Sequence, residues 1–160
     1  MAGLFLGLAC ALPSHAHKAH VHGEGKLDVV IDGAQIVLQL TLPLESVVGF
    51  ERAPKNESEA KALRDVQALL SNAQGLFIPT PAAGCTAEPA DVRTPQFDGS
   101  GHADIEARYA LRRQNPQALH GIETTVFRHF KRLHRIETQR IGPQGQGARR
   151  LTPRQPVLSW

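Results

Sequence analysis

Three histidines, His17, His20 and His22, stand close together near the beginning of the chain. Neutral imidazole is the commonest metal ligand of proteins near physiological pH. If a strand begins here, the rings of His20 and His22 lie on one side, with backbones about 6.7 Å apart. Two such imidazoles can turn onto one zinc ion, which each binds at about 2.0–2.1 Å, and His17 can add a third ligand. The other interpretation is a solvated segment that is rich in histidine.

A second set of candidate ligands, His102, Asp104 and Glu106, alternates along a strand-like segment. Alternate residues of a strand share a face, but His102 and Glu106 would lie about 13 Å apart along it. All three therefore cannot bind one ion without a bend, whereas His102 and Asp104 can serve as a pair. Polar residues on a solvated sheet face explain the same alternation.

A basic segment, FRHFKRLHR at residues 127–135, interleaves Lys and Arg with Phe127, Phe130 and Leu133. This spacing indicates a short helical turn with a basic outer face. Such a patch could bind nucleic acid or an anionic membrane, because neutralising phosphates supplies most nonspecific affinity. A solvated basic face is the other interpretation.

The motifs of common enzyme classes are absent from the sequence: there is no GxSxG elbow, P-loop, HExxH or CxxC. Cys85 has no histidine partner that the sequence identifies, so thiol catalysis is not indicated. The formal charge of +3 and the pI near 9.2 make the chain only mildly basic, which is too little to argue that it binds nucleic acid. We expect a protein that is not an enzyme and does not bind nucleic acid.

The apolar beginning of the chain indicates export. Residues 1–16 carry no charged side chain, and the apolar run at 4–12 is too short to span a bilayer. It resembles the hydrophobic region of a signal peptide, with Ser14 and Ala16 at the usual positions before the cleavage site, although Lys and Arg are missing in front of it. We predict a signal peptide at 1–16, no transmembrane segment and a single exported domain at 17–160. A buried N-terminal element is the alternative; lipidation at Cys10 is not expected.

Around these residues, two β-rich runs at 26–31 and 35–42 flank Asp32-Gly33, a hairpin signal. Asn56 and Glu59 form a capping-box pattern at the start of an amphipathic segment, which predicts a helix at 57–71 packed on a sheet. Further strands are expected at 102–111, 122–126 and 135–141, with a tight Gly-rich connection at 142–148. The pattern predicts one α+β domain, mostly antiparallel and sandwich-like, with one substantial helix.

Five segments together resemble one family, the ZrgA-type periplasmic proteins of Gram-negative bacteria. They are HVHGEGKLDVVIDG (20–33), VVGFERAP (47–54), PAAGC (81–85), HADIEARY (102–109) and IGPQGQGA (141–148). They occur in the same order over nearly the whole predicted mature chain. Each is weak alone, and jointly they are specific.

The resemblance implies an exported zinc-binding protein that helps to deliver zinc to an ABC importer or its binding protein. Family members usually carry a long loop rich in His and Asp before the strand that begins HADIE, and here FDGSG (97–101) replaces it. The resemblance also places the disulfide partner of Cys85 at position 113, where this chain has arginine. We therefore expect a free Cys85 thiol and a low-capacity zinc site.

The leading hypothesis is a periplasmic zinc-binding accessory protein. Its candidate metal ligands are His20 and His22, completed by His17, His102 and Asp104. Zinc suits histidine with carboxylate, but Cu²⁺ and Ni²⁺ also bind imidazole, so the sequence does not choose the metal. Two alternatives stay open, namely a metal-independent protein-interaction domain and an anion-binding surface protein that uses residues 128–135.

Overall fold

The computed structural model describes residues 22–97 and 103–160. The expected hairpin is present, since β1 (Glu24–Asp32) and β2 (Gln35–Pro43) pair antiparallel with Asp32 opposite Gln35. Gly33 takes the turn at φ 52, a left-handed conformation that glycine adopts because it has no Cβ. The Asp-Gly signal thus correctly predicted the hairpin turn, and the structure adds its register.

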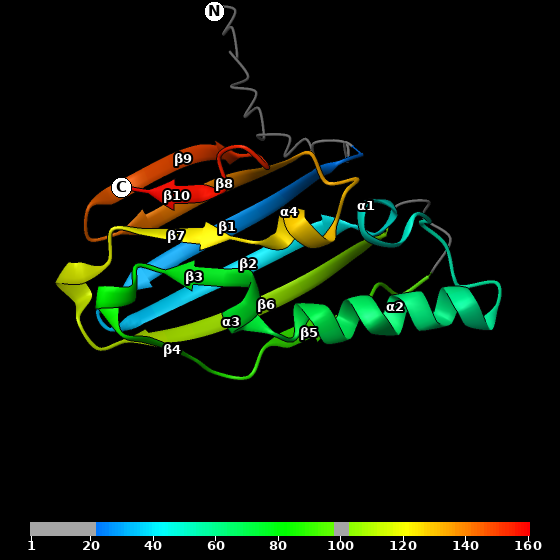
Figure 1. The fold of residues 1–160 in the computed structure, drawn as a ribbon, viewed down its shortest axis with the longest axis horizontal. Helices are drawn as coiled ribbons and strands as arrows, with labels where there is room; N and C mark the ends of the chain where they lie inside the picture. The colour runs from blue at the N-terminus through cyan, green and yellow to red at the C-terminus, as the bar shows by residue number, and fades with distance from the viewer. Residues whose placement is uncertain (1–21, 98–102) are drawn as a thin grey trace, which may run out of the picture.

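The strands in the described part of the chain form two sheets. The larger has the order β4-β6-β2-β1-β8-β9, with β5 also paired to β6, and the smaller has the order β10-β7-β3. The larger sheet is completed by β4 (Cys85–Ala87), β5 (Asp91–Arg93), β6 (Asp104–Arg113), β8 (Arg135–Gly142) and β9 (Gly145–Leu151). The smaller comprises β3 (Phe77–Pro79), β7 (Gly121–Thr124) and β10 (Val157–Ser159). Figure 1 shows the smaller sheet across one face of the larger, the expected sandwich-like α+β arrangement.

The core lies between the two sheets. Along β1 and β2 every second side chain is buried, including Leu27, Val29, Ile36, Leu38 and Leu40. The residues between them in β1, such as Lys26 and Asp28, are exposed on the other face. The larger sheet therefore has one apolar face and one open polar face, as period-two sequences dictate.

Two segments differ from the sequence predictions. Residues 142–148 were expected to be a connection, but β9 begins at Gly145 and pairs back along β8. Nearly every residue of β9 is exposed, so no apolar alternation marks this strand in the sequence. The strand expected at 122–126 ends at Thr124, whose hydroxyl accepts the Val126 N–H at 3.3 Å and favours a turn.

Tyr109 of β6 is fully buried, and its hydroxyl has no hydrogen-bond partner in the described part of the chain. Burial also raises the pKa of this phenol above its usual value. Because an unsatisfied buried donor costs about 1–3 kcal/mol, we expect Tyr109→Phe to raise the free energy of unfolding by about 1 kcal/mol. Urea unfolding of the two proteins measures this difference. A loss of stability in Tyr109→Phe would show that the hydroxyl is satisfied.

The predicted helix at 57–71 is α2 (Glu57–Leu70). Asn56 caps it as expected, and its side-chain oxygen accepts the Glu59 N–H at 2.9 Å. The other half of the capping box is displaced by one residue, because the Glu59 carboxylate accepts the N–H of Lys55 at 2.7 Å. The same carboxylate binds both terminal nitrogens of the Arg52 guanidinium at 2.6 and 2.8 Å. Val66 and Leu70 anchor one face of α2 in the core.

The bonds from Arg52 and then from Lys55 lower the pKa of Glu59 to about 2, against 4.5 for an ordinary glutamate. A carboxyl group with a depressed folded-state pKa stabilises the fold above its unfolded pKa, and this contribution disappears as the pH falls toward 2. We expect Glu59→Gln to be less stable than wild type at pH 7 and the gap to narrow below pH 4.5. Thermal unfolding across this pH range tests it. Glu57→Gln, at an exposed position of the same turn, is the control and should change less.

The remaining helices are short, and they are α1 (Leu44–Val48), α3 (Ala73–Leu76), α4 (Val126–His129), η1 (Pro81–Ala83) and η2 (Pro116–Ala118). Within the described ranges, no helix combines the length and the apolar character that crossing a bilayer requires.

Cys85 and Arg113 face each other in the pairing of β4 with β6, and Cys85 is a free thiol. The buried Arg113 guanidinium donates to Gly33 O at 2.6 and 2.8 Å and to Pro116 O at 3.0 Å. Burial raises the pKa of the Cys85 thiol more than the Arg113 charge lowers it. Where the resemblance places a disulfide, this chain has hydrogen bonds that tie β6 to the hairpin turn.

Candidate metal centre

The ends of four neighbouring strands, β6, β2, β1 and β8, lie side by side at one end of the larger sheet. We call this end the sheet edge, as distinct from an edge strand. There β1 and β8 begin side by side, with Glu24 opposite Arg135, and β2 ends where β6 begins, with Pro43 opposite Asp104. Helix α1 follows β2 directly and lies beside this edge (Figure 1). The buried hydroxyl of Ser46 in α1 accepts the N–H of Gly23 at 3.0 Å. This bond holds α1 against the start of β1, next to His22.

Glu51 is brought to His22 by the turn that ends α1. Gly49 caps α1 at φ 90, and its N–H bonds Glu45 O at 2.9 Å. The chain then reverses, so that Glu51 Oε1 lies 3.7 Å from His22 Nε2. The His22 side chain is 66% exposed, whereas that of Glu51 is only 18% exposed. The pair combines a ring that is free to turn with a carboxylate that its surroundings hold in place.

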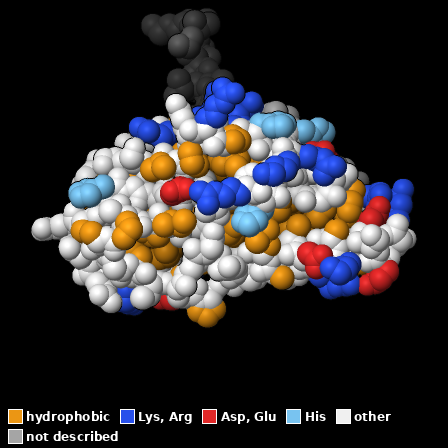
Figure 2. Space-filling view, viewed as in Figure 1, with side chains coloured by type: hydrophobic (Ala, Val, Ile, Leu, Met, Phe, Trp, Pro, Cys, Tyr) orange, Lys and Arg blue, Asp and Glu red, His pale blue; other side chains and the backbone are white. Residues whose placement is uncertain are grey.

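His134, the residue just before β8, lies at the same end of the sheet. Its backbone N–H donates to Gly23 O at 2.8 Å. Gly23 has φ 78, and a Cβ built on it would lie only 2.7 Å from Cδ2 of the His134 ring. The ring therefore rests against the backbone next to His22, in space that only glycine leaves. Figure 2 shows histidine side chains among Lys and Arg side chains on the upper part of the visible face.

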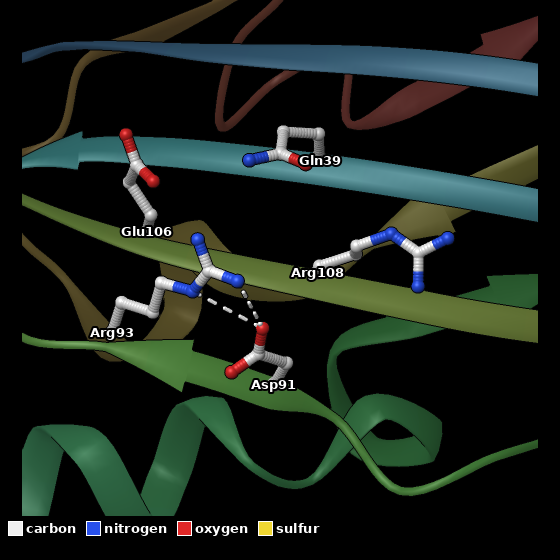
Figure 3. A pocket seen from close by; sticks show the side chains of 5 residues that line it. All are labelled: Gln39, Asp91, Arg93, Glu106 and Arg108. Carbon is white, nitrogen blue, oxygen red and sulfur yellow. Dashed lines mark hydrogen bonds and ion pairs between the residues drawn. The ribbon is translucent and has the colours of Figure 1, made fainter.

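Asp104 lies in a different environment, in the lining of a hollow on the open face of the sheet. The hollow is lined by Val92, Arg93, Thr94, Pro95, Gln96, Asp104 and Glu106. Asp104 and Glu106 share this face, as the alternation predicted. In the adjoining hollow, which Glu106 also lines, the Arg93 guanidinium binds Asp91 at 3.0 Å (Figure 3). A cation here would compete with the Arg93 guanidinium.

The structure thus describes two of the five predicted metal ligands, His22 and Asp104. They stand at the same edge of the sheet. However, β2 lies between β1 and β6, so these two strands are about 10 Å apart. His17, His20 and His102 lie outside the described residues. Among the residues that are described, no three His, Cys, Asp or Glu side chains are arranged to hold a metal ion.

The basic segment 127–135 is folded as the sequence suggested, with Phe127, Phe130 and Leu133 in the core. Its charge is partly neutralised: Arg128 binds Glu123 at 2.8 Å, and Arg135 forms an ion pair with Glu24. The Arg132 guanidinium would lie 3.0 Å from a Cβ at Gly49, so it covers the end of α1. The segment builds the edge of the sheet as well as presenting charge.

Sequence reasoning missed Glu51 and His134 as neighbours of His22. Glu51 stood inside the segment VVGFERAP, which contributed to the family resemblance, but no spacing linked it to the histidines. His134 was grouped with the basic segment. Only the parallel pairing of β1 with β8 brings residues 22–24 and 134–135 together.

Comparisons with known proteins give one positive finding. A search of curated proteins found no match. A family model described as ZrgA family zinc uptake protein matches residues 19–160, which include both described sheets and the three side chains at this edge. This chain therefore belongs to the ZrgA family of zinc uptake proteins.

Proposed function

We propose that this protein is exported to the periplasm, binds zinc there and assists a zinc importer without catalysing a reaction. The observation that carries the proposal is the exposed His22 ring, 3.7 Å from the Glu51 carboxylate at the edge of the sheet. Histidine nitrogen and carboxylate oxygen are both ordinary zinc ligands. Membership of a zinc uptake family supports zinc as the cargo.

The N-terminal histidines extend this candidate site. His20 and His17 precede His22 by two and five residues, within reach of one ion if the chain bends. Asp104 begins β6, on the opposite side of β2 from β1, and together with His102 it is a candidate for a second, weaker site. A few exposed ligands favour low capacity and rapid exchange, which suit a protein that passes zinc to a transporter.

Export and zinc binding are tested together on protein recovered from the periplasm. We expect a mature N-terminus at His17 and bound zinc in the isolated protein, measured by N-terminal sequencing and elemental analysis. Protein that stays in the cytoplasm with an intact N-terminus would contradict export.

The double variant His20→Ala plus His22→Ala is expected to bind zinc at least about tenfold more weakly, because removal of even the outer partners of metal ligands costs about 10–100-fold. Competition with a chromophoric chelator measures the affinity. Unchanged stoichiometry and affinity would refute these ligands. A protein without zinc affinity would instead favour a metal-independent interaction domain. If it also bound anionic vesicles in a salt-dependent way, the segment 128–135 would be the functional surface.

A further inference from the structure

We propose that Glu51 and His134 join His22 in a single zinc site of two histidines and one carboxylate. The inference rests on the proposed zinc-binding function and names ligands that lie far apart in the sequence. It is built on three described side chains, which come from the turn just before β1, the turn after α1 and the residue just before β8.

The first pair already has nearly the separation that zinc requires. Two ligand atoms bound to one tetrahedral ion at about 2.0–2.1 Å lie about 3.3–3.4 Å apart. His22 Nε2 and Glu51 Oε1 are 3.7 Å apart, a few tenths of an ångström more. A small rotation of the exposed His22 ring closes this gap, while the less exposed Glu51 stays in place.

The third ligand is placed by contacts of the backbone. Two N–H groups, those of His134 and Arg135, donate to Gly23 O at 2.8 and 3.2 Å. The exposed His134 ring lies against Gly23, which follows His22 directly in the chain, with the two Cα atoms about 3.8 Å apart. The three side chains are not yet arranged around one point, so the ion must draw the two exposed rings toward Glu51.

The chemistry of this set suits transfer of zinc. Three protein ligands leave the fourth position of a tetrahedral ion open to water or to an incoming ligand. The set carries one negative charge against the two positive charges of zinc, and the Arg132 guanidinium over the end of α1 adds positive charge nearby. Such a site holds zinc loosely enough to give it up to a receiver with more ligands.

The first experiment is zinc titration of the full chain and its variants against a chromophoric chelator. Glu51→Gln and His134→Gln are each expected to lower the affinity at least about tenfold, by the same reasoning as for other partners of zinc. Glu88→Gln and His120→Gln are the matched controls, because both residues are exposed and lie on other parts of the chain. The controls should bind zinc as wild type does.

A second measurement separates coordination from a structural effect. In His134→Cys, Co²⁺ should produce a thiolate-to-cobalt charge-transfer absorption that His120→Cys lacks; the latter also controls for the native Cys85 thiol. The ligand set of His22, Glu51 and His134 is overturned if His134→Cys lacks this absorption band. It is also overturned if Glu51→Gln or His134→Gln binds zinc with wild-type affinity. If His22→Gln still weakens zinc binding in that case, the proposed function stands. A wild-type chain that binds no zinc overturns both.

Discussion

Replacing Phe77 with alanine is expected to lower the free energy of unfolding by about 3–5 kcal/mol, the largest effect we anticipate from a single substitution in this protein. Phe77 is 1% exposed and begins β3, at the point where the smaller sheet meets the larger. Its ring lies 5.1 Å from that of Tyr109, centroid to centroid, and the planes are tilted by 59°. Alanine would remove this contact and leave a cavity between the sheets.

Urea unfolding of Phe77→Ala and wild type measures the difference. Phe97→Ala is the matched control, because Phe97 is 37% exposed and surface substitutions usually stay within about 0.5 kcal/mol. A loss below about 1 kcal/mol in Phe77→Ala would mean that the smaller sheet can collapse onto the vacated space, since the cost of such a substitution depends on how well the site relaxes.

Replacing Gly23 with alanine is expected to reduce both stability and zinc affinity. The left-handed conformation at φ 78 costs a residue with a Cβ about 1–2 kcal/mol. The new Cβ would also stand 2.7 Å from the His134 ring and 3.0 Å from Arg132 O. The ring must therefore move away from His22, and we expect zinc affinity to fall at least about tenfold, as for loss of a ligand's support.

Gly145→Ala is a close control for this prediction. Gly145 has φ 89, but a Cβ there would meet nothing within 4 Å. Both variants should lose stability through backbone strain, Gly23→Ala more because of its close contacts, and only Gly23→Ala should also lose zinc affinity. Equal zinc affinity in the two variants would show that the position of the His134 ring does not matter for the metal.

Several elements could be predicted from the sequence because their signals are local. Asp32-Gly33 specifies a tight turn, and Asn56 caps a helix whose apolar residues recur at helical spacing. The alternation in 102–111 correctly placed Asp104 and Glu106 on one face of β6. The family resemblance likewise placed Cys85 opposite position 113, where the strand pairing now puts Arg113.

Other elements could not be predicted because their pairing is long-range. β9 is an exposed edge strand whose residues bury little, so its sequence is like that of a loop. The parallel pairing of β1 with β8 joins segments more than a hundred residues apart, and no local signal encodes such a partner.

The same division holds for the candidate metal centre. Residue types and short spacing were sufficient to single out the N-terminal histidines, since ligand chemistry belongs to side chains and two residues apart on a strand share a face. They could not identify Glu51 and His134, whose closeness to His22 depends on the turn after α1 and on the pairing of β1 with β8. Only the tertiary structure decides which ligands form one metal site. The packing of the sheet edge determines which donor atoms can reach one ion, and distance along the sequence does not.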